Sequence, residues 1–147
     1  MLRFDAPKPL IIASVLLTLG SVLAILAGTL MHAAGSLFLA CYVVLAISNG
    51  ASPASLAVMK EMNRPDSVGQ VMGLFNTASY LAVGVLANLA GVVLDRFSDR
   101  AIVTASATIY PREAYLALFS GIAVVAVASV VSSFFVRETR GESRWAG

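Results

Sequence analysis

Residues 9 to 59 read PLIIASVLLTLGSVLAILAGTLMHAAGSLFLACYVVLAISNGASPASLAVM and contain no Asp, Glu, Lys or Arg. A bilayer core tolerates almost no ionised side chain, and one helical crossing takes about 20 apolar residues. The run is therefore too long for one crossing and fits two, joined by the turn Met31-His32-Ala33-Ala34-Gly35-Ser36. It predicts transmembrane helices over residues 10–31 and 36–59.

Two further runs without charge follow, at residues 67–94 and 114–136. They predict transmembrane helices over 68–94 and 114–136. The apolar piece from Ala101 to Pro111 is about half as long as a crossing, so we expect it to form an outside loop. The first predicted helix, 10–31, is longer than the apolar region of a secretory signal, which has about 7 to 15 residues, so we expect it to be retained. The expected fold is an all-α integral membrane protein with four transmembrane helices in one membrane domain, residues 1–147.

The composition supports the same class of protein. Of the 147 residues, 59% are apolar and 12% are charged, which leaves too little polar surface for a small soluble domain. Disorder requires low hydrophobicity and high net charge, whereas the net charge here is +2. The basic residues are scattered between apolar runs and form no stripe, so we expect no nucleic-acid partner. The expected surroundings are the lipid bilayer.

The basic residues also predict the orientation, because they accumulate on the cytoplasmic side of membrane proteins. One side of the predicted bundle carries Arg3, Lys8, Lys60, Arg64, Arg137, Arg140 and Arg144, and the other carries Arg96, Arg100 and Arg112. This distribution places both termini in the cytoplasm of a multi-pass protein of the cell (inner) membrane.

No pattern in the sequence indicates catalysis or metal binding. The chain has one histidine, His32, and one cysteine, Cys41, and it lacks paired carboxylates, a Ser/His/Asp set and a phosphate-binding loop. We therefore expect no enzyme activity, no catalytic residue, no metal and no cofactor. Since no carboxylate, histidine or lysine lies deep in a predicted span, the chain alone offers no obvious proton relay.

The main polar interruption is the segment from Lys60 to Ser67. Pro65 disfavours a helical Arg64, so one helix is expected to stop here and the next to start. Asp66 or Ser67 is expected to cap the incoming helix by accepting hydrogen bonds from its first N–H groups.

Polar side chains at membrane depth differ between the spans. The first and fourth contain small hydroxyls, which can bond to their own helix backbone. The amides lie in the second and third spans, which should therefore face protein or a water-filled cavity, while the first and fourth face lipid more. The candidates for lining a solute path are Tyr42, Asn49, Asn76 and Tyr80.

Helical spacing places these residues on two faces. On the second span, Gly35, Tyr42 and Asn49 share a face with Pro53, which is expected to act as a kink or hinge. The third span carries a stripe of small and polar residues, Gly69, Gly73, Asn76, Tyr80, Gly84, Ala87 and Gly91. The stripe fits either a packing seam, in which another helix approaches closely, or a solute path.

The run from Lys60 to Asp95, KEMNRPDSVGQVMGLFNTASYLAVGVLANLAGVVLD, resembles the tenth and eleventh helices of major facilitator superfamily transporters. Lys8-Pro9 resembles the start of their ninth helix. The residues Tyr115 through Phe119, the long apolar helix after them and Arg137-Glu138-Thr139-Arg140-Gly141 resemble their twelfth helix. The resemblance implies helices nine to twelve of a twelve-helix carrier, in which the tenth and eleventh line the central cavity.

Two features depart from this placement. The residues from Gly91 to Arg100 partly resemble a cytoplasmic loop motif of the family, and that assignment would invert the topology. Four helices are also too few, because the family binds its substrate between two halves of six helices each and alternates access by rocking them. The missing helices are expected from the same gene or from another chain.

The leading hypothesis is an incomplete secondary transporter that moves a small solute by alternating access. The alternative is a stand-alone four-helix membrane protein that acts as an oligomeric or scaffolding subunit. A small multidrug-type dimeric pump is a third option, which lacks the carboxylate that such pumps carry in their first span.

Overall fold

The computed structural model describes residues 7–50, 52–105 and 107–136, and helices account for most of them. The helices are α1 (Pro7–Met31), α2 (Gly35–Asn49), α3 (Ser52–Met62), α4 (Val68–Asp95) and α5 (Arg112–Phe134), with a 3₁₀ turn, η1, at Ser98–Arg100. Four stretches are long and apolar enough to cross a membrane: Lys8–Met31, Gly35–Met62, Val68–Asp95 and Arg112–Phe134. The described chain is thus compatible with a multi-pass membrane protein.

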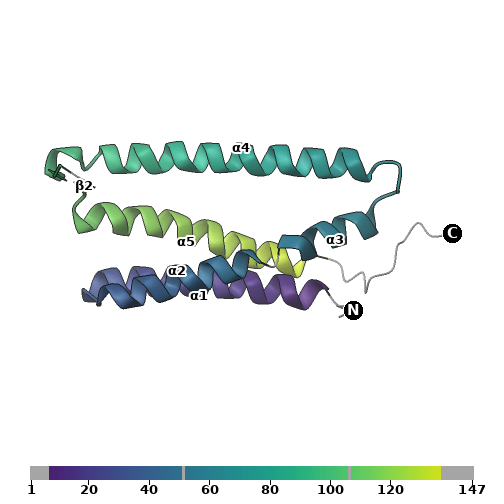
Figure 1. Ribbon diagram of the computed structural model, residues 1–147, viewed down its shortest axis with the longest axis horizontal. Helices are drawn as coiled ribbons and strands as arrows, with labels where there is room; N and C mark the ends of the chain where they lie inside the picture. The colour runs from purple at the N-terminus through teal and green to yellow at the C-terminus, as the bar shows by residue number, and fades with distance from the viewer. Residues whose placement is uncertain (1–6, 51, 106, 137–147) are drawn as a thin grey trace.

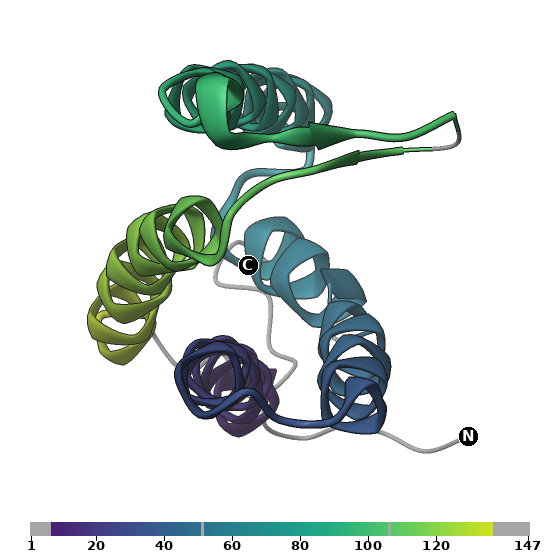
Figure 2. The same cartoon turned by 90° about the vertical axis from the view of Figure 1, so that its left-hand side faces the viewer.

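The helices are arranged around α1, which packs against α2, α3 and α5. Figure 1 shows these helices running side by side, with α4 set apart from them. Seen end-on in Figure 2, α1 lies between α5 and α2, and α4 lies on the side opposite to α1. Most of the half-buried residues of α4 lie near its two ends, toward α3 and α5, and the residues between them are exposed apart from Ser79.

Burial therefore differs from the expectation that the first and fourth spans face lipid more than the inner pair. Within the described chain α1 is the central helix, and Ser21, Val22 and Ile25 are buried on it. No residue of α4 is buried. From the polarity of the side chains we expected α4 to be more buried than α1. The expectation was wrong because burial depends on contacts with neighbouring helices, which the sequence does not display.

The predicted second span, 36–59, is divided into α2 and α3. The described interruption is at Gly50, and Pro53 is the second residue of α3. In the first turn of a helix the missing N–H of proline costs no hydrogen bond, so Pro53 fits a restart there better than a helix interior. The Gly50 N–H closes the end of α2 by bonding the Ile47 carbonyl at 2.9 Å.

The connection between α3 and α4 corrects the predicted cap. Helix α3 ends at Met62 and α4 begins after Ser67, which occupies the N-cap position without a side-chain capping bond. Its hydroxyl instead donates to the Arg64 carbonyl at 3.0 Å. The turn thus uses Ser67 as a donor within the loop, where the sequence predicted an acceptor for α4.

The predicted loop between the third and fourth spans contains a short antiparallel hairpin. Strand β1 (Ile102–Val103) pairs with β2 (Thr108–Ile109), with Ile102 opposite Ile109. The Thr104 N–H donates to the Ala107 carbonyl at 2.9 Å and continues the pairing toward the tip. Figure 2 shows the hairpin extending sideways from α4 and α5, to the right of the helices.

A candidate pocket where α1 meets α5

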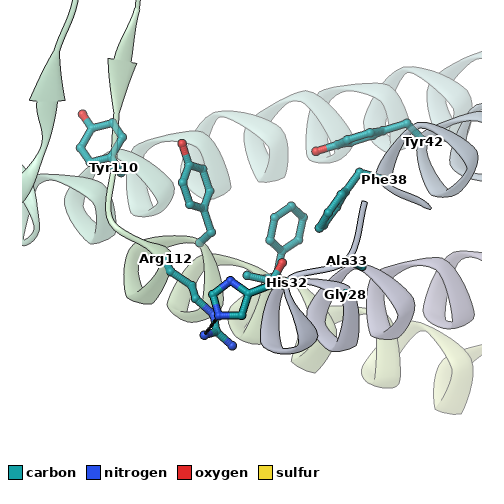
Figure 3. A pocket seen from close by; sticks show the side chains of 10 residues that line it. Gly28, His32, Ala33, Phe38, Tyr42, Tyr110 and Arg112 are labelled. Atoms are coloured by element: carbon teal, nitrogen blue, oxygen red, sulfur yellow. Dashed lines mark hydrogen bonds between the residues drawn. The ribbon is translucent and has the colours of Figure 1, made fainter. Parts of the chain in front are cut away.

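A pocket of about 490 Å³ lies at one end of the bundle, between the α1–α2 turn, the start of α5 and the side of α2. Figure 3 shows the side chains that surround it. Its lining is rich in aromatic rings and includes one arginine and one histidine: Gly28, Thr29, His32, Ala33, Phe38, Tyr42, Tyr110, Arg112, Tyr115 and Phe119. The pocket contains no Asp or Glu among these residues.

The turn after α1 positions His32. This residue has φ 53°, the only positive φ of a non-glycine residue in the described chain. The Ala33 N–H bonds the Gly28 carbonyl at 2.9 Å, which together with the left-handed residue forms the Schellman ending of a helix. Histidine tolerates this conformation better than a β-branched residue does.

Gly28 allows the turn and the start of α2 to approach α1 closely. A Cβ atom added at Gly28 would lie 2.7 Å from Leu37 Cδ2 and 3.5 Å from Phe38 Cζ. Glycine is therefore the residue that brings the Phe38 ring against α1, where it lines the pocket.

Arg112, the first residue of α5, joins the two helices at this end. Its Nη1 lies 2.8 Å from His32 Nε2, and its Nη2 donates to the Leu30 carbonyl in the last turn of α1. The carbonyls of a last turn have no partners within their own helix, and a cation there also interacts favourably with the helix dipole. The Arg112 Nε atom is buried and has no hydrogen-bond partner.

A second cation makes the equivalent contact at the far end. Lys8, near the start of α1, donates from Nζ to the Phe134 carbonyl at the end of α5, at 3.1 Å. Helices α1 and α5 are antiparallel, so a basic residue at the start of each satisfies a carbonyl at the end of the other. The arrangement fixes the register of the two helices and hence the position of Arg112 in the pocket.

Neither contact was predicted from the sequence. A signal was present, because Lys8 stands directly before one apolar run and Arg112 two residues before another. Arg112 served as an indicator of orientation only, and Lys8 as an indicator of orientation and of the start of a helix. The predicted orientation also rests largely on Arg3, Arg137, Arg140 and Arg144, which lie outside the described residues.

The four predicted path residues do not come together. Tyr42 lines the pocket, while Asn49, farther along α2, is exposed and donates from Nδ2 to the Leu45 carbonyl at 3.0 Å. Asn76 and Tyr80 are exposed on α4, with Tyr80 at 78%. Figures 1 and 2 place α2 and α4 in different parts of the bundle.

The glycine stripe of α4 packs against no other helix in the described chain. A Cβ atom added at Gly69, Gly73, Gly84 or Gly91 would have no heavy atom within 4 Å outside its own helix backbone and its chain neighbours. A shallow groove of about 460 Å³ runs along α4 beside Tyr80, Gly84 and Asn88. The predicted packing seam is therefore open in this chain.

The predicted hinge, Pro53, borders another cavity. This cavity, of about 660 Å³, lies between α1 and the α2–α3 interruption, and its walls are mostly apolar. Pro53 and Gly50 lie on one side of it, Leu10 and Ser14 on the other. The cavity thus lies between the start of α1, the end of α2 and the start of α3.

The described residues contain no group of three or more His, Cys, Asp or Glu that could hold a metal ion. Cys41 is buried on α2. No family model, curated protein or solved structure matches the chain.

Proposed function

We propose that the chain is part of a secondary transporter of the major facilitator type, which moves a small solute across the membrane by alternating access. The observation that carries the proposal is α4, a 28-residue apolar helix without a single buried residue. A helix of that length and composition has the properties of a membrane span, and its open face carries both small residues and amides.

Lipid alone is a poor partner for this face. Asn88 donates from Nδ2 to its own helix at the Gly84 carbonyl, at 2.8 Å, which leaves its amide oxygen to find another partner. Unpaired amide groups in hydrocarbon are costly, and polar residues inside membranes tend to face protein or water. Further helices that cover α4 would provide that environment, and Asn76 and Tyr80 would then line the space between them and this chain.

The sequence resemblance supports the same arrangement. It equates α4 with the eleventh helix, which lines the central cavity in that family. Four candidate spans are too few for two halves that rock about a central site, so the missing transporter helices are part of the proposal. The expected cargo is a small-molecule solute. Its binding would not require a charged side chain at membrane depth from this chain.

The test is the reactivity of single cysteines on two faces of α4. In a Cys41→Ser background, Asn76→Cys and Tyr80→Cys are introduced at the native locus, with Ala78→Cys as the control. Ala78 is also exposed and lies between the two test positions, but about 160° away from the stripe around the helix. A water-soluble, membrane-impermeant maleimide then measures which face meets water.

We expect Asn76→Cys and Tyr80→Cys to react several times faster than Ala78→Cys. Once the transported solute is identified, its addition should slow the reaction at these two positions. Equally slow reaction at all three positions would contradict the proposal, because α4 would then face lipid or a dry interface on both sides.

The open α4 also fits the alternative, a stand-alone four-helix oligomer in which a second copy covers the stripe. The mass of the solubilised protein separates the two. A homo-oligomer in mild detergent, with slow labelling of Asn76→Cys and Tyr80→Cys, would favour the oligomeric or scaffolding subunit over the transporter.

A further inference from the structure

The pocket where α1 meets α5 presents hydrogen-bond donors around a positive charge. The Arg112 guanidinium is permanently charged, and each of its two Nη atoms keeps a second N–H beyond the one that bonds His32 or Leu30. When His32 Nε2 accepts from Arg112, the proton of the neutral imidazole is on Nδ1, which becomes a further donor. No carboxylate lines the pocket, and the neighbouring Glu113 is exposed outside it. The donor set is suited to an anionic oxygen ligand such as a phosphate ester.

The rest of the pocket is apolar and aromatic. Phe38 and Phe119 are half-buried and lie beside Tyr42 and Tyr115, whose rings are more exposed. In Figure 3 Phe38 and Tyr42 lie above the Arg112–His32 pair, so one ligand can place a charged end and an apolar end against different walls. This combination favours an amphiphile over a free inorganic anion.

The position of the pocket indicates the source of such an amphiphile. It lies where α1 ends and where α2 and α5 begin, at one end of the apolar helices. For membrane-spanning helices this level is the interface, where tyrosines and basic residues meet lipid headgroups. Basic pockets between transmembrane helices recognise anionic headgroups on the cytoplasmic side of membranes, and we expect the same chemistry at this end, which the charge distribution places on the opposite side.

We propose that this pocket binds the headgroup of an anionic phospholipid, with Arg112 and His32 on the phosphate and the aromatic rings on the glycerol and the first acyl carbons. The inference depends on insertion of the helices into a membrane and not on transport. The bound lipid bridges the α1–α2 turn and the start of α5, next to the Arg112 contact that joins them.

The experiment uses the full chain purified in maltoside micelles and native mass spectrometry to count bound lipid. The probes are dioctanoyl phosphatidylglycerol, which is anionic, and dioctanoyl phosphatidylcholine, which has the same acyl chains and no net charge. Inorganic phosphate is the third probe. We expect phosphatidylglycerol to bind about tenfold more tightly than phosphatidylcholine, because both carry the phosphate but the choline cation of the second is repelled by Arg112.

Arg112→Gln is expected to remove this preference. The matched control is Arg100→Gln, which deletes the same charge at the same end of the bundle but outside the pocket, and should leave the preference unchanged. Because Arg112 also holds the end of α1, Ala33→Glu serves as a second variant. This variant places a carboxylate beside the Arg112 guanidinium and offsets its charge without deleting the side chain. It should therefore also abolish the preference for phosphatidylglycerol.

Equal binding of the two lipids, or an unchanged preference in a folded Arg112→Gln or Ala33→Glu variant, would overturn the proposal. Displacement of phosphatidylglycerol by inorganic phosphate at similar concentration would show a site for a free anion, which also contradicts it. Loss of the preference on Arg100→Gln would mean that general surface charge attracts the lipid. None of these readouts depends on transport activity, so they leave the transporter proposal to its own test.

Discussion

Helices α1 and α4 are alike in length and apolar composition but opposite in environment. Helix α1 has 25 residues and α4 has 28, and each qualifies as a membrane span. Yet α1 contacts three other helices, while α4 has no buried residue. The glycines make the contrast sharper, because Gly28 of α1 lies tight against Leu37 and the four glycines of the α4 stripe have no neighbour.

The difference shows that apolar character does not select the partners of a helix in a membrane protein. In a bilayer an apolar helix gains no hydrophobic free energy by replacing lipid contacts with contacts to another helix. Close packing and hydrogen bonds therefore determine which helices associate. Helix α1 has both, through Gly28 and through the end contacts of Lys8 and Arg112. Helix α4 has side chains able to make such contacts, but within the described residues it meets α3 and α5 mainly near its ends and its glycine stripe stays open.

The largest expected effect is overpacking at Gly28. Gly28→Leu forces a side chain into the space held by Leu37 and Phe38, and overpacking of this kind costs about 1–3 kcal/mol. The measurement is reversible unfolding of the chain in mixed micelles. Gly73→Leu on α4 is the control and should not destabilise the chain, because its surroundings are open and leucine is a better helix former than glycine. An equal loss in both variants would remove the contrast between the helices.

Removal of the Arg112 contact should have the next largest effect. Arg112→Met keeps much of the side-chain volume but leaves the Leu30 carbonyl without its donor, which we expect to cost about 1–2 kcal/mol. Arg100→Met, at the same end of the bundle, removes only an exposed cation–π contact with the Phe97 ring at 5.5 Å, so we expect it to cost less, about 0.5 kcal/mol. The same unfolding assay measures both variants. An unchanged free energy of unfolding in Arg112→Met would show that the Arg112 contact does not hold the end of α1.

The glycine stripe gives an effect of opposite sign. Gly73→Ala and Gly84→Ala should each stabilise the chain alone by about 0.5–1 kcal/mol, because alanine is the better helix former and its Cβ meets nothing. In the native assembly the same substitutions should weaken attachment of whatever helix covers the stripe. Measured by co-purification, unchanged attachment would mean that the stripe is not the contact surface.

Loss of the second end contact should have the smallest effect. Lys8→Met removes one exposed hydrogen bond to the Phe134 carbonyl, for which we expect about 0.3–1 kcal/mol at low salt and less at high salt. Comparing unfolding at two salt concentrations tests this. A cost independent of salt would assign the effect to packing of the lysine stem instead.

Several features followed from the sequence because they depend on local properties. The absence of charge over residues 9–59, 67–94 and 114–136 indicated where long apolar helices lie, since helix length and apolarity are written into consecutive residues. The small hydroxyls behaved as local chemistry predicts, with Thr18 bonding Ser14 and Thr29 bonding Ile25 within α1. The break beside Pro53 also lies at a residue that restricts helices.

The candidate site was less accessible to sequence reasoning. Tyr42 was selected as a polar residue on a helix face, but its neighbours Arg112 and Tyr115 are far away in the chain. Ser67 shows the same limit at short range, because its position suggested a cap and its hydroxyl donates elsewhere. Several partners are possible for each side chain, and only the packed arrangement selects one.

The sequence by itself determined that this protein consists of long apolar helices, where their polar interruptions fall and how its charges are distributed, because these are sums over neighbouring residues. The tertiary structure decided that α1 is central, that Arg112 joins the end of α1 beside an aromatic pocket, and that the face of α4 stays open. Those outcomes depend on contacts between residues far apart in sequence, such as Arg112 with Leu30, whose strength is set by distance and orientation rather than by residue type.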